Sequence, residues 1–154
     1  MYVFSRYIHD LRCNAEIYYD PVMNNTNAEF DLTLEKNFCE QILNLDKTIR
    51  FAGITNNMGD MITAKYGKNT APLLSGLKAE ISAFQSTTRM VSIQEELGDK
   101  LGKIIYVSEV FENIKRVTIS LENYCFLLIS FDVHADHDAI IVNKILPLVR
   151  QIHY

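Results

Sequence analysis

The chain has 154 residues, of which 48% are apolar, and it carries a formal net charge of −4 at pH 7. This length and apolar content predict one globular domain with an ordinary hydrophobic core, and they exclude an intrinsically disordered protein. Because the net charge is negative, nothing in it favours binding to the phosphate backbone of nucleic acids.

The cysteines and the apolar runs bear on the cellular compartment. Cys13, Cys39 and Cys125 are widely spaced and form no Cys-x-x-Cys pair, which argues against a zinc site and predicts reduced thiols. The amino terminus lacks the apolar core of a secretion signal. The longest apolar run, at residues 124–129, is far too short to cross a bilayer. We therefore expect a cytoplasmic protein without a membrane-inserted segment.

Residues 1–33 differ in composition from the rest of the chain. They carry five acidic residues against two arginines and include the polar, turn-rich segment DPVMNNTNAEF, which is typical of a linker. We expect a partly flexible extension over residues 1–33 and a single domain over residues 34–154. The first element of that domain is a helix capped by Thr33, because apolar residues recur there at helical spacing: Leu34, Phe38, Ile42 and Leu45.

The stretch RFAGITNNMGDMITAKYG, residues 50–67, predicts a β-hairpin. In its first strand the side chains alternate, so that Ile49, Phe51 and Gly53 share one face. Residues 56–60 have turn chemistry, because asparagine and glycine accept positive φ at low cost. The returning strand then begins near position 61.

A long amphipathic helix is predicted from Pro72 to about residue 95–100, because a proline is well tolerated in the first turn of a helix. Its apolar stripe recurs at spacings of three and four residues: Leu74, Leu77, Ile81, Phe84, Thr88 and Val91. This stripe has two interpretations: it covers the apolar face of the sheet, or it also meets a second copy of the chain. Met58, Met61 and Met90 add adaptable apolar surface.

Three strand-like runs follow at residues 104–111, 115–121 and 124–133, and the short turns between them predict an antiparallel meander. If the first run is an edge strand, it needs cover, which a second copy would provide. After Asp136 a final helix is predicted, which Pro147 should kink or end early. Together the elements predict an α+β fold, a five-stranded antiparallel sheet with helices packed on it.

This order of elements and the hairpin IRFAGITNNMGDMITAKY resemble roadblock and longin-like (profilin-like) domains over residues 34–152. The segments IRFAGI, LGK, KRVTISL and LLISFDVHADHDAIIVNKILPLV are also similar to a family of small uncharacterised archaeal proteins. The roadblock resemblance implies an α-β-β-α-β-β-β-α domain that forms a homodimer through its long helix and the adjacent edge strand. It also implies a scaffold or signalling regulator, often of small GTPases, with no catalytic residue to carry over.

The segment DVHADHD, residues 132–138, is the candidate ligand site of the sequence. Imidazole and carboxylate groups suit a divalent metal, which makes His134, Asp136 and His137 the candidate ligands. The alternative is structural: Asp136 caps the next helix, Asp138 complements its dipole, and both histidines lie on the surface. We favour the structural alternative and expect no bound metal.

No nucleophile, phosphate-binding loop or acid–base pair stands out, so we expect no enzyme activity and no cofactor. Two functions remain open. The first is a non-enzymatic protein-interaction and regulatory module that dimerises. The second is a small-molecule sensing domain, with a pocket between sheet and long helix lined by residues such as Phe51, Phe84 and Tyr106.

Overall fold

The computed structural model describes residues 36–122 and 124–151 of the chain. These residues form a five-stranded antiparallel sheet in the order β2-β1-β5-β4-β3, which confirms the predicted fold class. The predicted extension over residues 1–33, with the cap Thr33 and the helix residue Leu34, lies outside the described residues. After a helix at residues 36–45, the elements are β1 (Ile49–Thr55), β2 (Met61–Tyr66), α3 (Leu77–Leu101), β3 (Tyr106–Val110), β4 (Lys115–Ser120), β5 (Phe126–Phe131), α4 (His137–Ile140), η2 (Ile141–Ile145) and α5 (Leu146–Gln151).

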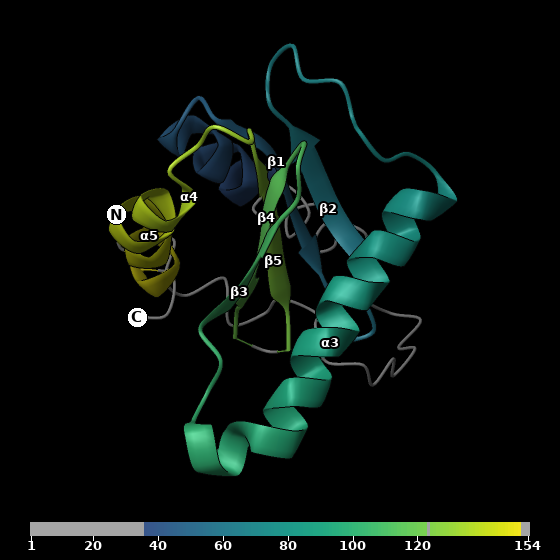
Figure 1. The fold of residues 1–154 in the computed structure, drawn as a ribbon, viewed down its shortest axis with the longest axis vertical. Helices are drawn as coiled ribbons and strands as arrows, with labels where there is room; N and C mark the ends of the chain where they lie inside the picture. Colours follow the sequence, from purple (N-terminus) through teal and green to yellow (C-terminus); the bar gives the residue numbers. More distant parts are fainter. Residues whose placement is uncertain (1–35, 123, 152–154) are drawn as a thin grey trace, which may run out of the picture.

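Helices lie on both sides of the sheet, but they cover it unequally. Figure 1 shows α3 on one side, and the helix at residues 36–45 with α4 and α5 on the other. The hydrophobic core lies on this second side, where Ile42, Leu127 and Ile145 are fully buried. Burying one such side chain contributes roughly 1.5–3 kcal/mol. The interpretation that the long helix covers the main apolar face of the sheet is therefore wrong.

Strand β1 contains a bulge that changes which side chains face the core. Its pairing with β5 shifts between Ile49 and Phe51, which makes Arg50 the additional residue. Because of this shift, Ile49 lies in the same core as Ala52 and Ile54. Phe51 instead lines the space beneath α3. The prediction that Ile49 and Phe51 share a face is wrong, since a bulge interrupts simple alternation.

Helix α3 starts later than predicted. It begins at Leu77 and ends at Leu101, whereas the sequence suggested a start at Pro72. Gly76 occupies the position before the helix with φ of 53°, a left-handed conformation that glycine adopts without a Cβ clash. Leu74 therefore lies in the loop before the helix and not on its face.

The carboxyl-terminal helical run continues through Pro147 to Gln151 and does not end early. A π-helical segment, η2, precedes the proline. Pro147 lies inside this continuous run, two residues after the π-helical segment, and π-helical turns are a recognised irregularity within helices. Within the described part of the chain, no helix is long and apolar enough to span a membrane.

Cys125 differs from the expectation of reduced thiols. It is fully buried just before β5, and it is disulfide-bonded. Disulfides are uncommon in the reducing cytoplasm, so this residue does not support the cytoplasmic prediction.

Candidate functional site

The apolar stripe predicted for α3 faces largely away from the sheet. The first four of its members are exposed and the last two are half-buried, in the order Leu74, Leu77, Ile81, Phe84, Thr88 and Val91. Leu77 is 69% exposed and Phe84 is 53% exposed. The side chains that α3 buries are smaller or polar, apart from one methionine: Ala83, Ser86, Thr87 and Met90. The stripe therefore offers apolar surface to another molecule.

Side chains from β2 and from the loop before α3 extend this apolar surface. Met61 and Tyr66 project from the edge strand β2, Leu73 lies in the loop, and all three are exposed. They border the same cavity as three stripe residues, so we define one apolar patch: Met61, Tyr66, Leu73, Leu74, Ile81 and Phe84. The sequence did not single out Tyr66, although hairpin pairing places it opposite Phe51, with 5.0 Å between the ring centroids.

The turn of the β1–β2 hairpin contacts α3. Gly59 has φ of 85°, and a Cβ atom at this position would lie 2.6 Å from the Cα atom of Phe84. Only glycine fits, because the conformation and the close approach both exclude a side chain. The Asn56 side-chain oxygen holds the turn by accepting the backbone N–H groups of Met58 and Asp60, at 2.9 and 3.0 Å. The turn thereby fixes the position of α3 beside β2.

A cavity of about 670 Å³ lies between α3 and the sheet, bordered by the apolar patch. Phe51 and Phe84 line it, in agreement with the sequence interpretation. Tyr106 does not line it, because its side chain packs against the hydrophobic core on the other face of the sheet. The volume falls in the range of small-molecule sites.

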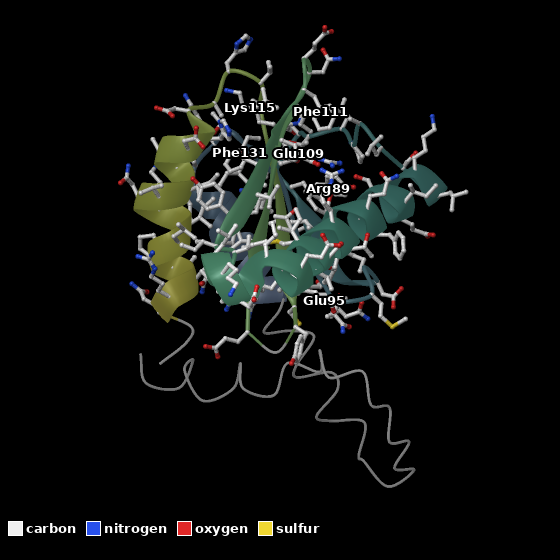
Figure 2. All side chains as sticks on the ribbon, turned by 60° about the horizontal axis from the view of Figure 1, so that its bottom comes forward. Arg89, Glu95, Glu109, Phe111, Lys115 and Phe131 are labelled. Atoms are coloured by element: carbon white, nitrogen blue, oxygen red, sulfur yellow. The ribbon has the colours of Figure 1, made fainter. Side chains whose placement is uncertain are left out.

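An ion-pair network joins α3 to the sheet beside this cavity. Arg116 of β4 donates from Nε to the carboxylate of Glu109 on β3 at 3.0 Å, and also from Nη2. The same guanidinium donates to the hydroxyl groups of Ser82 and Ser86 on α3. Arg89 of α3 forms an ion pair with Glu109 from the helix side, and Figure 2 labels both residues where α3 meets the sheet. Two guanidinium groups therefore share one carboxylate.

The network keeps Glu109 ionised. Burial alone would raise the pKa of this carboxyl group, but the hydrogen bonds and charges of Arg116 and Arg89 outweigh it and lower the pKa. A carboxylate held in this way is committed to a structural role and is poorly suited to proton transfer at neutral pH.

A second group of exposed apolar side chains lies at the opposite edge of the sheet. Strand β3 is an edge strand, as the sequence suggested, and its outer backbone groups have no neighbouring strand among the described residues. Exposed apolar side chains surround it, from the last turns of α3 to the end of β3: Leu97, Leu101, Ile105, Val110 and Phe111. In Figure 1, α3 runs obliquely across the sheet, and its carboxyl end leads into β3.

Two of the three candidate metal ligands in the DVHADHD segment, Asp136 and His137, have structural roles. Asp136 caps α4 by accepting a backbone N–H at 3.4 Å, and Asp138 lies in the first turn. His137 is buried, and its Nε2 atom shares a hydrogen bond of 2.9 Å with the Ser108 hydroxyl of β3. His134 is exposed in the preceding turn, and no metal-binding cluster occurs among the residues that the structure describes. The interpretation that His137 lies on the surface is wrong, because it fastens the edge strand to α4.

Comparison with known proteins identifies the fold. No protein-family model and no curated protein matches the sequence. Among solved structures, a roadblock/LC7 domain from Streptomyces avermitilis aligns with 74% of this chain and 90% of its own, at a TM-score of 0.57 and 13% identity. The chain has the roadblock/LC7 fold. The gliding protein MglB from Thermus thermophilus aligns with 77% of this chain and 85% of its own, at a TM-score of 0.62 and 15% identity.

A further structure, described as MglB with a tetrameric arrangement, has a TM-score of 0.65 and 13% identity. It covers 79% of this chain and 87% of its own. At such identities the similarity establishes the roadblock fold and not an activity, since one fold serves many functions. The resemblance to small archaeal proteins stays a prediction.

Proposed function

We propose that this roadblock domain is a non-enzymatic protein-interaction and regulatory module, which pairs with a second copy through α3 and the edge strand β3. The observation that carries the proposal is the outward-facing stripe of α3, in which Leu77 and Phe84 are both exposed. Monomeric proteins rarely expose large contiguous apolar surfaces, and they usually protect their edge strands. A second copy that paired along β3 would continue the sheet and would lie against the exposed side of α3, which crosses the sheet obliquely from the β2 side to β3.

Two further observations support this function. Glu109, the acidic group between α3 and the sheet, is committed to ion pairs with two arginines, which leaves this carboxylate unsuited to acid–base chemistry. In addition, one of the structures with a similar fold is described as MglB with a tetrameric arrangement.

Sedimentation equilibrium tests the pairing. The wild-type protein should form a particle of about 35 kDa, twice the 17.7 kDa chain. Leu77→Lys and Val110→Lys place a charge on the stripe and beside the edge, and each should shift the mass toward one chain. Val142→Lys is the matched control, because Val142 is equally an exposed apolar residue but belongs to η2, and its mass should stay at that of a dimer. A wild-type protein that remains a monomer at high concentration contradicts the proposal.

The roadblock resemblance also motivates a partner. We propose that the dimer binds a small GTPase or another signalling protein and regulates it without chemistry of its own. Binding and GTP hydrolysis would be measured for purified small GTPases of the same cell, with and without this protein. If no GTPase binds this protein and none changes its rate of GTP hydrolysis, a GTPase is not the partner. The sedimentation test of the dimer is unaffected by that result.

The cavity under α3 favours a second candidate function, a small-molecule sensing domain. Its volume of about 670 Å³ would hold a ligand between the sheet and the long helix. Retention of a small molecule by the purified native protein, detected by mass spectrometry after denaturation, tests this candidate. The sensing function is contradicted if denaturation releases no small molecule and the native protein also binds none of the probes described in the next section.

A further inference from the structure

We propose that the cavity under α3 binds an amphipathic anion, a small molecule with an apolar body and one carboxylate group. The inference rests on the second candidate function and names its ligand class. It does not depend on the dimer.

Two hydroxyl groups from strands of the sheet face the cavity. Thr118 of β4 and Ser130 of β5 are 7% and 8% exposed, and both line the cavity. Among the residues that the structure describes, neither side chain makes a hydrogen bond. The two hydroxyl oxygens are not enclosed by the protein, so both are open to the cavity and can reach a bound molecule. An oxygen atom of a bound ligand would supply the missing partner for each.

Positive charge lies at the same end of the cavity. Arg116 pairs directly across the sheet with Ser130, and it stands two positions before Thr118 on β4. Alternation places these three side chains on one face of the sheet, toward α3. Because Arg116 and Arg89 share the single carboxylate of Glu109, the network keeps a net charge of +1. This charge favours an anionic group beside the two hydroxyls.

Ser82 and Ser86 complete the polar end from the helix side. Both accept hydrogen bonds from Arg116, the latter at 3.3 Å, so the hydroxyl protons of both remain available to donate. Hydroxyl donors backed by a guanidinium group suit the oxygens of a carboxylate, because hydrogen bonds to an ionised acceptor are the strong ones.

The remainder of the cavity is apolar. Phe51 and the apolar patch line it on the β1–β2 side. Asp60 and Glu80 also line this side, and both are exposed, so their charges disfavour an anionic head there. The carboxylate therefore points to Arg116, and the apolar body lies toward the patch.

The cavity stays open because small side chains face each other across it. On α3 the small residues recur at helical spacing: Ala79, Ser82, Ala83 and Ser86. On the sheet, Ala64 and Ser130 line the cavity opposite them. A larger residue on the helix side would fill the space. Ala83→Leu is the variant that does so, since Ala83 is buried against the sheet.

Isothermal titration calorimetry of the full chain with decanoic acid tests the proposal, with decan-1-ol and decylamine as probes of equal length. Decanoic acid should bind one molecule per chain. Decylamine should bind about 100-fold more weakly, because it meets a positive charge. Thr118→Val removes one hydroxyl group and keeps the shape of the side chain, and it should lower the affinity for decanoic acid about 10-fold. Ala83→Leu should abolish binding.

Thr63→Val is the matched control. Thr63 is another buried threonine on a strand whose hydroxyl lacks a partner, but it does not line the cavity. Its substitution should leave the affinity for decanoic acid unchanged. If Ala83→Leu does not fold, as judged by circular dichroism, the pair of threonine variants carries the test.

Three results would overturn the proposal: no binding of decanoic acid up to about 1 mM, equal affinities for the acid and the alcohol, or equal losses in Thr118→Val and Thr63→Val. The two proposals fail separately. A monomer that binds decanoic acid contradicts only the pairing, and a dimer that does not bind it contradicts only the ligand site.

Discussion

Two phenylalanines on opposite sides of the sheet make a matched test of how α3 is placed. Phe131 of β5 is fully buried in the hydrophobic core, whereas Phe84 of α3 is 53% exposed. Truncating a buried phenylalanine to alanine costs about 3–5 kcal/mol, so Phe131→Ala should lower the free energy of unfolding by that amount. Complete burial of a phenylalanine contributes roughly 1.5–3 kcal/mol, and half of that predicts a loss of about 1 kcal/mol for Phe84→Ala.

The assay is unfolding in urea, monitored by circular dichroism, at a protein concentration low enough that the chain is monomeric. At high concentration the wild-type protein should become more stable, because association adds to the apparent stability, and Phe84→Ala should lose this gain. Equal losses for Phe84→Ala and Phe131→Ala in dilute protein would show instead that Phe84 packs on the sheet like a core residue.

Three smaller perturbations address the local contacts of the fold. The pKa of Asp46 is lowered to about 2, from 3.8 in the unfolded chain, chiefly by a hydrogen bond from Lys144. The ionised carboxylate therefore stabilises the fold above pH 3.8, and this contribution is lost as the pH falls toward 2. Asp46→Asn should remove this contribution to the pH dependence of the free energy of unfolding, which is no more than about 1 kcal/mol for a group near the surface. An acid unfolding curve with the same slope as that of the wild-type protein would contradict this role of Asp46. Gly59→Ala should destabilise the protein by about 1–3 kcal/mol in urea unfolding, because its φ and its contact with α3 both oppose a side chain; a neutral effect would deny that contact. Glu109→Gln removes the carboxylate that two arginines share and should accelerate hydrogen exchange in α3, whereas unaltered exchange there would show that the network does not hold the helix.

The sheet could be predicted because each strand has its own local signal. Strand β5 reads as apolar on both faces, and the structure buries all six of its residues at the centre of the sheet. The hairpin follows from its asparagine and glycine turn. The bulge at Arg50 could not be predicted, since it depends on pairing with β5, a strand far away in the chain.

Periodicity also could not orient α3. The spacing of Leu77 and Phe84 correctly places them on one side of a helix, but it does not say which side meets the sheet. The buried side is formed mostly by small residues such as Ala83 and Ser86, which allow a close approach and carry little hydrophobic signal. Likewise, His137 had no signal of burial in the sequence, because its partner Ser108 comes from the distant strand β3.

Hydrogen exchange measured as a function of protein concentration locates any interface between copies of the chain and therefore tests the pairing through α3 and β3. If two copies pair through α3 and β3, the backbone amides of Tyr106–Val110 should exchange more slowly as the concentration rises, while those of the other edge strand, Met61–Tyr66, should not change. Exchange in β3 that is independent of concentration, or protection that appears at β2 instead, would contradict pairing through β3.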